Sequence, residues 1–170
     1  AIALNLGVKV SKIKKALKKF LGIQRRFTKV FSVGKREFYD DYAHHPTEIK
    51  AVINSARQVY KDRKIICVFQ PHRYSRVKSL KNEFASSFKY SDTVVLCPVY
   101  SAGEKIKYNF NQDNFSKLIS KKSKTQIINI KNQKELKSYF KKNLLEDEMI
   151  ICMGAGSISN WIREIGDELK

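Results

Sequence analysis

Cysteine is scarce in this sequence of 170 residues, which has only Cys67, Cys97 and Cys152. An odd number of cysteines cannot pair off completely, so a framework of disulfides is not indicated. Histidine is equally rare, and no spacing of His, Cys or Glu typical of a zinc site occurs. Each cysteine falls in a segment with the apolar pattern of a strand. We therefore expect buried thiols in a reducing, cytoplasmic protein, and no metal site.

The sequence also has few residues that break regular structure, with three prolines and seven glycines. There is no long stretch rich in proline, glycine or serine that would link two independent domains. The hydrophobic content of 42% is enough to bury one sizeable core. No apolar run is long enough to span a bilayer, and we expect no membrane partner.

Acidic residues are missing from the first 36 positions, and the chain carries a net charge of +18. A positive field of this size attracts nucleic acid or anionic lipid. The lysines are nevertheless scattered, and neither zinc-finger spacing nor an aromatic RNA-binding strand occurs. We therefore expect mostly solvated surface and no specific nucleic-acid partner. A basic α/β module that binds nucleic acid through residues 9–36 is the alternative, which a salt-sensitive shift with DNA or RNA would favour.

The opening residues, Ala1 to Gly7, have the pattern of a last helical turn capped by glycine. Because Ala1 is not an initiator methionine, we expect the sequence to be a fragment. The next segment, Val10 to Leu21, is amphipathic. We expect Ser11 to cap a short helix whose lysines face water. Its apolar residues are expected to pack inward: Ile13, Ala16, Leu17 and Phe20.

Strand and helix patterns alternate along the rest of the chain. Residues 27–33 and 37–41 predict a hairpin, or two adjacent short strands, with the turn at Gly34 and Lys35. The remaining strands are predicted over residues 64–70, 93–98, 125–130 and 149–153. Helices are predicted over residues 46–60, 77–90, 112–122 and 132–143, and on the apolar stripe from Ile158 to Leu169. Apolar strands separated by helices imply an α/β fold, a mostly parallel sheet with helices on both faces.

One strand-end loop concentrates cationic side chains. The apolar run of residues 65–69 stops at Pro71 and is followed by His72, Arg73 and Arg76. Ligands of α/β proteins bind at the carboxyl ends of such strands. Two arginines three residues apart can converge on one carboxylate or phosphate. A solvated basic turn is the alternative interpretation.

A second polar loop, Asp40-Asp41-Tyr42-Ala43-His44-His45-Pro46-Thr47-Glu48, also follows a short extended run and leads into a helix. Together the two loops suit a site for charged groups rather than an apolar ligand. Gly154-Ala155-Gly156 follows the last strand and is either a phosphate cradle or a tight turn. Neither a Gly-x-Ser-x-Gly elbow nor a Gly-x-x-x-x-Gly-Lys-Ser/Thr loop occurs, so this chain cannot by itself build the usual triphosphate cradle.

These loops, together with residues 22–27, 99–104 and 154–158, closely resemble the C-terminal domain of the Mur ligases. The resemblance covers nearly the whole chain. It implies a Rossmann-like, mostly parallel sheet in residues 23–170, with residues 1–22 as the end of the preceding, central ATP-binding domain. The loop of residues 71–76 is most similar to that of members which join L-alanine to UDP-N-acetylmuramate at the expense of ATP, a cytoplasmic step of peptidoglycan synthesis. Members that attach a whole peptide to the same sugar have Pro-Arg-Ser-Asn there and are the nearest alternative.

The resemblance also implies which residues act. The phosphate loop, the Mg²⁺ ligands and most catalytic groups would lie on the central domain, so the fragment alone is expected to be inactive. Arg26 would reach the ATP phosphates, Asp41 the ribose, and Tyr42 would lie near the adenine. Ser157 stands where the family pattern has an acidic residue, which leaves its role open.

The remaining implied residues surround the amino acid. His44 and Arg73 are the implied catalytic residues, and Arg76 joins them in binding the substrate. The two arginines would hold the carboxylate of the incoming amino acid. Whether His44 accepts a proton or only holds the substrate stays open.

Overall fold

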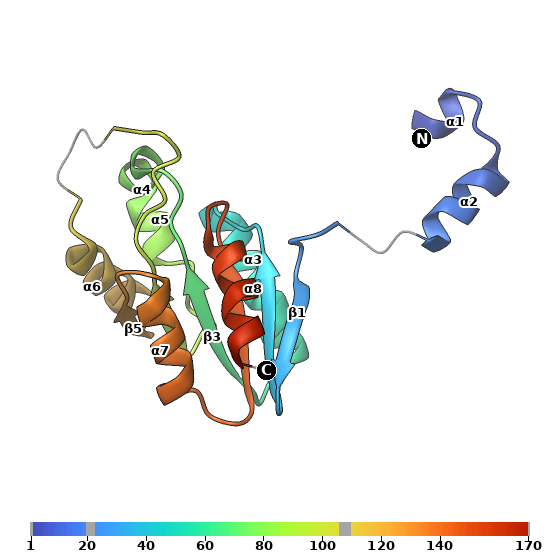
Figure 1. The fold of residues 1–170 in the computed structure, drawn as a ribbon. Coiled ribbons are helices and arrows are strands. Elements are labelled where there is room, and N and C mark those ends of the chain that lie inside the picture. The colour runs from blue at the N-terminus through green and yellow to red at the C-terminus, as the bar shows by residue number, and fades with distance from the viewer. Residues whose placement is uncertain (1, 20–22, 106–109, 170) are drawn as a thin grey trace.

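The computed structural model describes residues 2–19, 23–105 and 110–169, and its main body is a six-stranded sheet between two layers of helices (Figure 1). The strands follow the spatial order β1-β2-β6-β3-β4-β5. The first pairs with the second antiparallel, and all other neighbours are parallel, which confirms the predicted sheet. The strands are β1 Thr28–Val33, β2 Arg36–Asp41, β3 Lys64–Phe69, β4 Thr93–Leu96, β5 Gln126–Asn129 and β6 Glu148–Met153.

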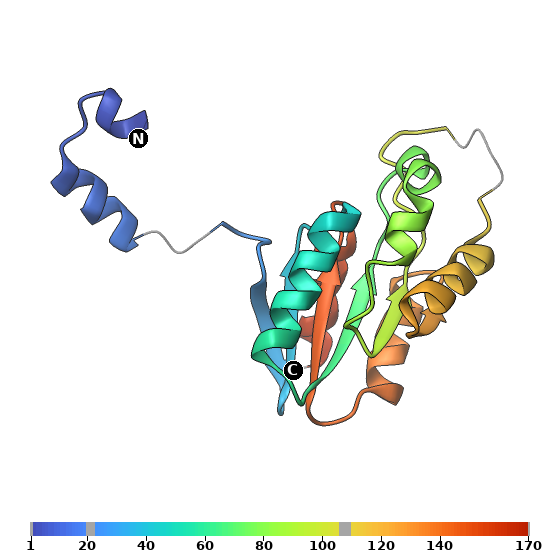
Figure 2. The same ribbon diagram turned by 180° about the vertical axis from the view of Figure 1, so that it is seen from behind.

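Helices cover both faces of the sheet, as predicted. One face carries α3 Pro46–Val59, α4 Tyr74–Ser79, α5 Lys81–Ala85 and α6 Gln112–Ser123 (Figure 2). The other carries α7 Gln133–Asn143 and α8 Ile158–Leu169. Alternate residues of β3 enter opposite cores, with Cys67 facing α3 and Ile66 facing α8. The central strands are therefore apolar on both faces, which is why their sequences read as continuous apolar runs.

The register of the sheet brings the carboxyl ends of three strands level. Met153 of β6 pairs with Asp41 of β2 on one side and with Phe69 of β3 on the other. The loops that follow these strands must therefore emerge next to one another at one edge of the sheet. This confirms the prediction that the polar loops after these strands lie at the same edge of the sheet.

Within the main body, two local expectations differ from the structure. The single helix predicted over residues 77–90 is two short helices, α4 and α5, that meet at Leu80 (φ −115°, ψ 27°). Leu80 leaves helical geometry, so the hydrogen-bond ladder restarts there. Cys97 lies one residue beyond β4, whereas Cys67 and Cys152 lie in strands as expected. All three thiols are free and buried, and burial raises the pKa of Cys67 to about 12.

The first two helices, α1 Ile2–Asn5 and α2 Val10–Lys19, lie apart from the sheet (Figures 1 and 2). Gly7 ends the first of them at φ 74°, as predicted. The second begins before Ser11, which is therefore not its cap.

The inward packing predicted for α2 is also wrong. Leu17 is 64% exposed, Ala16 is exposed and Ile13 is only half-buried, while Phe20 lies outside the described residues. No described residue of α1 or α2 is buried, because their apolar stripe meets no other part of the described chain. Among the described helices, none combines the length and apolar character needed to cross a membrane.

Candidate active site

Three loops meet at the carboxyl edge of β2, β6 and β3. They comprise residues 42–45, 70–73 and 154–157. Main-chain hydrogen bonds extend the sheet into them: the Gln70 N–H donates to Met153 O (3.0 Å) and the Gly154 N–H to Asp41 O (3.2 Å). The loops are thus held by the sheet itself, which suits a site that must keep its geometry.

His44 is oriented by its own loop. Its Nδ1 lies 2.9 Å from Tyr42 O, and its backbone N–H donates to Glu48 Oε2 at 3.0 Å. A carbonyl oxygen only accepts, so Nδ1 carries the proton of this contact and Nε2 keeps its lone pair in the neutral ring. The neighbouring His45 is the N-cap of α3, where it forms a capping box with Glu48. The two histidines therefore have different tasks, and no metal-type pair forms.

Arg73 and Arg76 lie at the beginning of α4, as the sequence suggested. Arg73 is the exposed N-cap residue and has a left-handed backbone (φ 71°), fixed by its N–H bond to Tyr100 O (2.8 Å). Arg76 is half-buried, and its Nη1 donates to His72 Nδ1 (3.2 Å) and His72 O (3.3 Å). One guanidinium is thus free to turn toward solvent, whereas the other is held against the loop.

His72 connects the arginine loop to its neighbours. Its ring stacks on Tyr100 (centroids 5.6 Å apart) and meets His44 edge-on at 5.9 Å. Burial lowers the pKa of His72, and the nearby Arg76, His44 and Arg73 lower it further. Its Nδ1 accepts from arginine, so the neutral ring carries its proton on Nε2. The cluster is a cationic surface beside a neutral donor, an arrangement complementary to an anion.

Asp41, the predicted ribose ligand, is buried at 3% exposure. Its Oδ2 accepts the Phe27 N–H (2.7 Å) and its Oδ1 the Ala43 N–H (2.8 Å). Burial raises the pKa of Asp41, and these two hydrogen bonds only partly oppose that effect. The Asp41 carboxylate therefore already binds two backbone N–H groups of its surroundings. Only its remaining lone pairs could accept hydrogen bonds from a ligand. Arg26 is exposed, and Tyr42 is half-covered by Arg25, whose guanidinium carbon lies 4.8 Å from the ring centroid.

The glycine loop is a tight turn against the arginine loop rather than an open cradle. A Cβ on Gly154 (φ 152°) would lie 2.8 Å from Gln70 O, and one on Gly156 would lie 2.5 Å from both Gln70 Oε1 and Tyr100 Cγ. Ser157 Oγ accepts from Gln70 Nε2 at 3.0 Å, and Gln70 Oε1 accepts the Ile158 N–H at 3.0 Å. Ser157 thus binds the neighbouring loop, a role that the sequence did not reveal.

We expect Gly156→Ala to lower the free energy of unfolding by about 3 kcal/mol, because the methyl group overlaps two packed groups. Gly103→Ala is the matched control. It has open space but a positive φ of 81°, so strain alone should cost it about 1 kcal/mol. Urea denaturation of both variants measures the difference. Equal losses of stability in the two variants would show that the packing of Gly156 against Gln70 and Tyr100 adds no cost to that of backbone strain.

Sequence reasoning missed a buried carboxylate at this edge, Asp40, which is fully buried. Its Oδ2 accepts from Ser159 Oγ (2.6 Å) and Arg163 Nη2 (3.2 Å), and lies 3.7 Å from Arg25 Nε. A charged residue near the end of a buried strand was the available signal, because such a group needs a partner. No spacing in the sequence identifies its partners, because Arg163 lies 123 positions away and Arg25 lies on a different segment, before β1.

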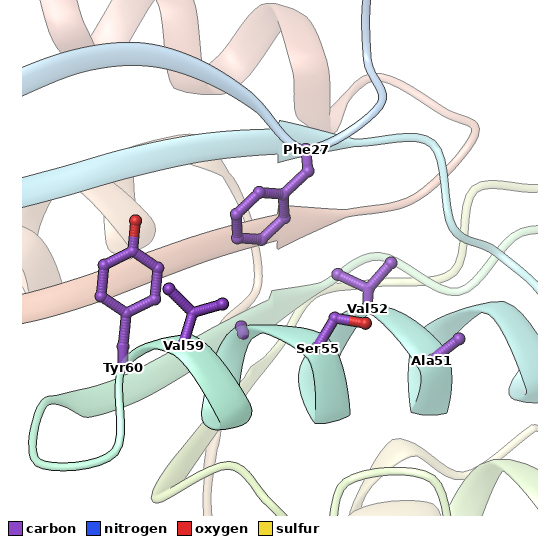
Figure 3. A pocket seen from close by; sticks show the side chains of 7 residues that line it. Phe27, Ala51, Val52, Ser55, Val59 and Tyr60 are labelled. Carbon is purple, nitrogen blue, oxygen red and sulfur yellow. The ribbon is translucent and has the colours of Figure 1, made fainter.

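A separate apolar hollow of about 350 Å³ runs along α3 and lies below Phe27 (Figure 3). It contains no charged group, so it does not suit a charged substrate. Its walls are Phe27, Ala51, Val52, Ser55, Ala56, Val59 and Tyr60.

Within residues 2–19, 23–105 and 110–169, no cluster of three or more His, Cys, Asp or Glu could hold a metal ion.

Comparison with proteins of similar sequence points to one family. The chain is 49% identical over 165 residues to a UDP-N-acetylmuramate–L-alanine ligase of Pelagibacter ubique, covering 97% of this chain and 36% of that protein. It is 38% identical over 170 residues to the ligase of the same name from Ruegeria pomeroyi, covering all of this chain and 36% of that protein. The chain therefore spans only about a third of the length of these relatives.

Solved structures agree. A UDP-N-acetylmuramate-alanine ligase from Thermotoga maritima superimposes with a TM-score of 0.71 and 27% identity over 98% of this chain and 35% of that one. A murein peptide ligase from Psychrobacter arcticus gives 0.72, with 20% identity over 98% of this chain and 34% of that one, which shows the shared fold. The family model described as Mur ligase, glutamate ligase domain, matches residues 25–156. Since that match covers well over half of the sequence, this chain belongs to the Mur ligase family and contains its glutamate ligase domain.

Proposed function

We propose that this chain is the C-terminal, amino-acid-binding part of an ATP-dependent, cytoplasmic ligase that joins L-alanine to UDP-N-acetylmuramate in peptidoglycan synthesis. The observation that carries this proposal is the cluster at the carboxyl end of β3, where the cations Arg73 and Arg76 and the ring of His44 lie around the neutral His72. The names of the relatives support the choice of substrates.

The cluster suits a small amino acid presented by its carboxylate. Arg73, which is exposed, would grip the carboxylate with its planar fork, and Arg76 would add a second, pre-positioned charge. In the reaction, ATP transfers its γ-phosphoryl group to the muramoyl carboxylate, giving ADP and an acyl phosphate. The amine of alanine then forms the amide bond, phosphate leaves, and the nitrogen loses a proton. Orienting that amine is what the arginines contribute.

His44 has a ring nitrogen that could take that proton. Its Nδ1 is engaged with Tyr42 O, so the Nε2 lone pair is the one that can accept a proton or hold the amine. A change at His44 that removes the Nε2 lone pair but keeps the packing of the ring distinguishes these two roles. If Nε2 accepts the proton, the pH dependence of the ligation rate should change. If Nε2 only holds the amine, the KM for alanine should change.

The residues present fit contacts to one side of a nucleotide, but the sequence has no phosphate loop that could enclose its triphosphate. Arg26 offers an exposed cation, Tyr42 an exposed ring face, and Asp41 its unused lone pairs. We propose that these contact the phosphates, adenine and ribose of ATP. Mg²⁺ would neutralise phosphate charge in the complex, with its ligands on the preceding domain. The exposed apolar residues of α2 support assigning residues 1–22 to that domain, which would cover them.

Substrate choice tests the proposal directly. The full-length protein should release phosphate from ATP when given UDP-N-acetylmuramate with L-alanine, and should form the corresponding amide. A preference for L-alanyl-γ-D-glutamyl-diaminopimelate over alanine would instead assign the chain to the peptide-attaching branch. Tight, sequence-selective nucleic-acid binding at about 0.2 M salt would favour the basic-module alternative.

Residues 1–170 alone should fold but release no phosphate from ATP with Mg²⁺ above background. The physical reason is that the sequence has no phosphate-loop lysine motif to hold the triphosphate. A colorimetric phosphate assay on the purified chain, with the full-length protein as the positive control, measures this. Turnover by the isolated chain would mean that the chemistry is not where we place it.

A further inference from the structure

The fully buried Asp40 joins three segments that are far apart in sequence. Through Oδ2 it accepts from Ser159 and Arg163 of α8, and it forms an ion pair with Arg25, which precedes β1. Arg25 in turn donates from Nη2 to Gly154 O at 2.6 Å. The carboxylate therefore links the start of the domain to the glycine loop and to the last helix.

This cluster is not built for stability alone. Three of its buried polar atoms have no hydrogen-bond partner among the described residues: Asp40 Oδ1, Arg25 Nε and Arg163 Nη1. A fully buried carboxylate that is paired with partly exposed arginines and keeps an unbonded oxygen recovers its desolvation cost only in part, so the cluster is weak evidence for a stabilising role. A carboxylate that holds an arginine in one place does, however, fix geometry.

The geometry that it fixes is the turn around Arg26. Arg25 and Phe27 both have left-handed backbones (φ 59° and 48°), which cost energy for non-glycine residues unless the surroundings hold them. Arg25 is held by its side-chain contacts and by its carbonyl, which accepts the Tyr42 N–H at 2.8 Å. Phe27 is held by its N–H bond to Asp41 at 2.7 Å. The exposed Arg26 is therefore presented by a turn that is pinned on both sides.

We propose that Asp40 is a positioning residue for nucleotide binding: acting through Arg25, it sets the turn that aims Arg26 at the phosphates of ATP. This inference rests on the proposed function. Asp40 itself is fully buried, and its neighbour Asp41 pins the other side of the same turn. The consecutive aspartates thus act as a pair of anchors for one loop.

The test compares Asp40→Asn with Glu37→Gln in the full-length protein. Glu37 is the matched control, because it lies on the same strand and pairs with Lys29 and Arg63 at the opposite end of β2. We expect Asp40→Asn to weaken binding of a non-hydrolysable ATP analogue, measured by calorimetry, and to raise the KM for ATP, each by about tenfold. The KM for alanine should stay within about twofold. Glu37→Gln should change none of these values.

An Asp40→Asn protein that melts earlier but keeps wild-type ATP binding would overturn the proposal, since its role would then be structural only. If this variant does not fold, Arg25→Lys replaces it, because lysine keeps the charge but cannot reach both Asp40 and Gly154 O. Unchanged nucleotide affinity in Arg25→Lys overturns the proposal equally. If wild-type protein fails to ligate alanine yet binds the analogue, the proposed substrate is wrong. The comparison of analogue binding by Asp40→Asn and Glu37→Gln then still tests the positioning role of Asp40. Absence of analogue binding by the wild type refutes both.

Discussion

Arg73→Lys in the full-length protein is expected to raise the KM for alanine roughly ten- to a hundredfold while leaving the KM for ATP nearly unchanged. Lysine retains the positive charge but loses the planar fork that matches both oxygens of a carboxylate. Arg73 is exposed at the N-cap of α4, and its side chain is therefore available to a ligand. The effect should thus appear in alanine binding rather than in folding.

Steady-state kinetics with each substrate varied in turn measure this change. Arg36→Lys is the matched control, because it makes the same change of side chain at the amino end of β2, where Arg36 is half-buried and its Nε donates to Val33 O (3.3 Å). It should leave both KM values unaltered. A change confined to the ATP term in Arg73→Lys would show that the strand-end loop does not bind the amino acid.

Asp41→Asn should produce the opposite pattern, with ATP use weakened and a smaller effect on alanine. An amide keeps one acceptor oxygen but turns the other position into a donor. That donor would face either the Phe27 or the Ala43 N–H, which the carboxylate now accepts. The resulting unpaired group should also lower the free energy of unfolding by about 1 to 3 kcal/mol.

Calorimetric titration with an ATP analogue, combined with urea denaturation, separates the two effects of Asp41→Asn. Asp113→Asn is a suitable control, since Asp113 accepts from Asn129 at an exposed position of α6. A variant that loses stability yet binds the analogue normally would limit Asp41 to holding its loop.

The fold was largely predictable because its local and long-range signals agree. The apolar runs ending at Phe69 and Met153 can only be strands buried on both faces, and the intervening helical patterns force parallel pairing. The break at Leu80 was not predictable, because no proline or glycine marks it. Leu17 misled the interpretation for a different reason: periodicity shows that an apolar face exists, but not what covers it.

In the candidate site, too, some residues could be predicted from the sequence and others could not. Arg73, Arg76 and His44 could be named because strand-end loops meet at one edge of a parallel sheet, and the structure brings these residues to that edge. The environments of Asp40 and Gln70 depend in part on residues more than 80 positions away, Ser159 for Asp40 and Ser157 for Gln70. Contacts of that kind arise only when the sheet register is fixed, and no spacing in the sequence encodes them.

We propose above all that the loop from Pro71 to Arg76 binds the carboxylate of alanine. The most direct measurement is the ratio of kcat/KM for L-alanine to that for L-alaninamide, in wild-type and Arg73→Met full-length protein. We predict that the wild type prefers alanine by at least about a hundredfold, because the amide cannot satisfy the arginines, and that the preference falls at least about tenfold in the variant. An equal ratio in the two proteins would show that Arg73 does not bind the carboxylate of alanine.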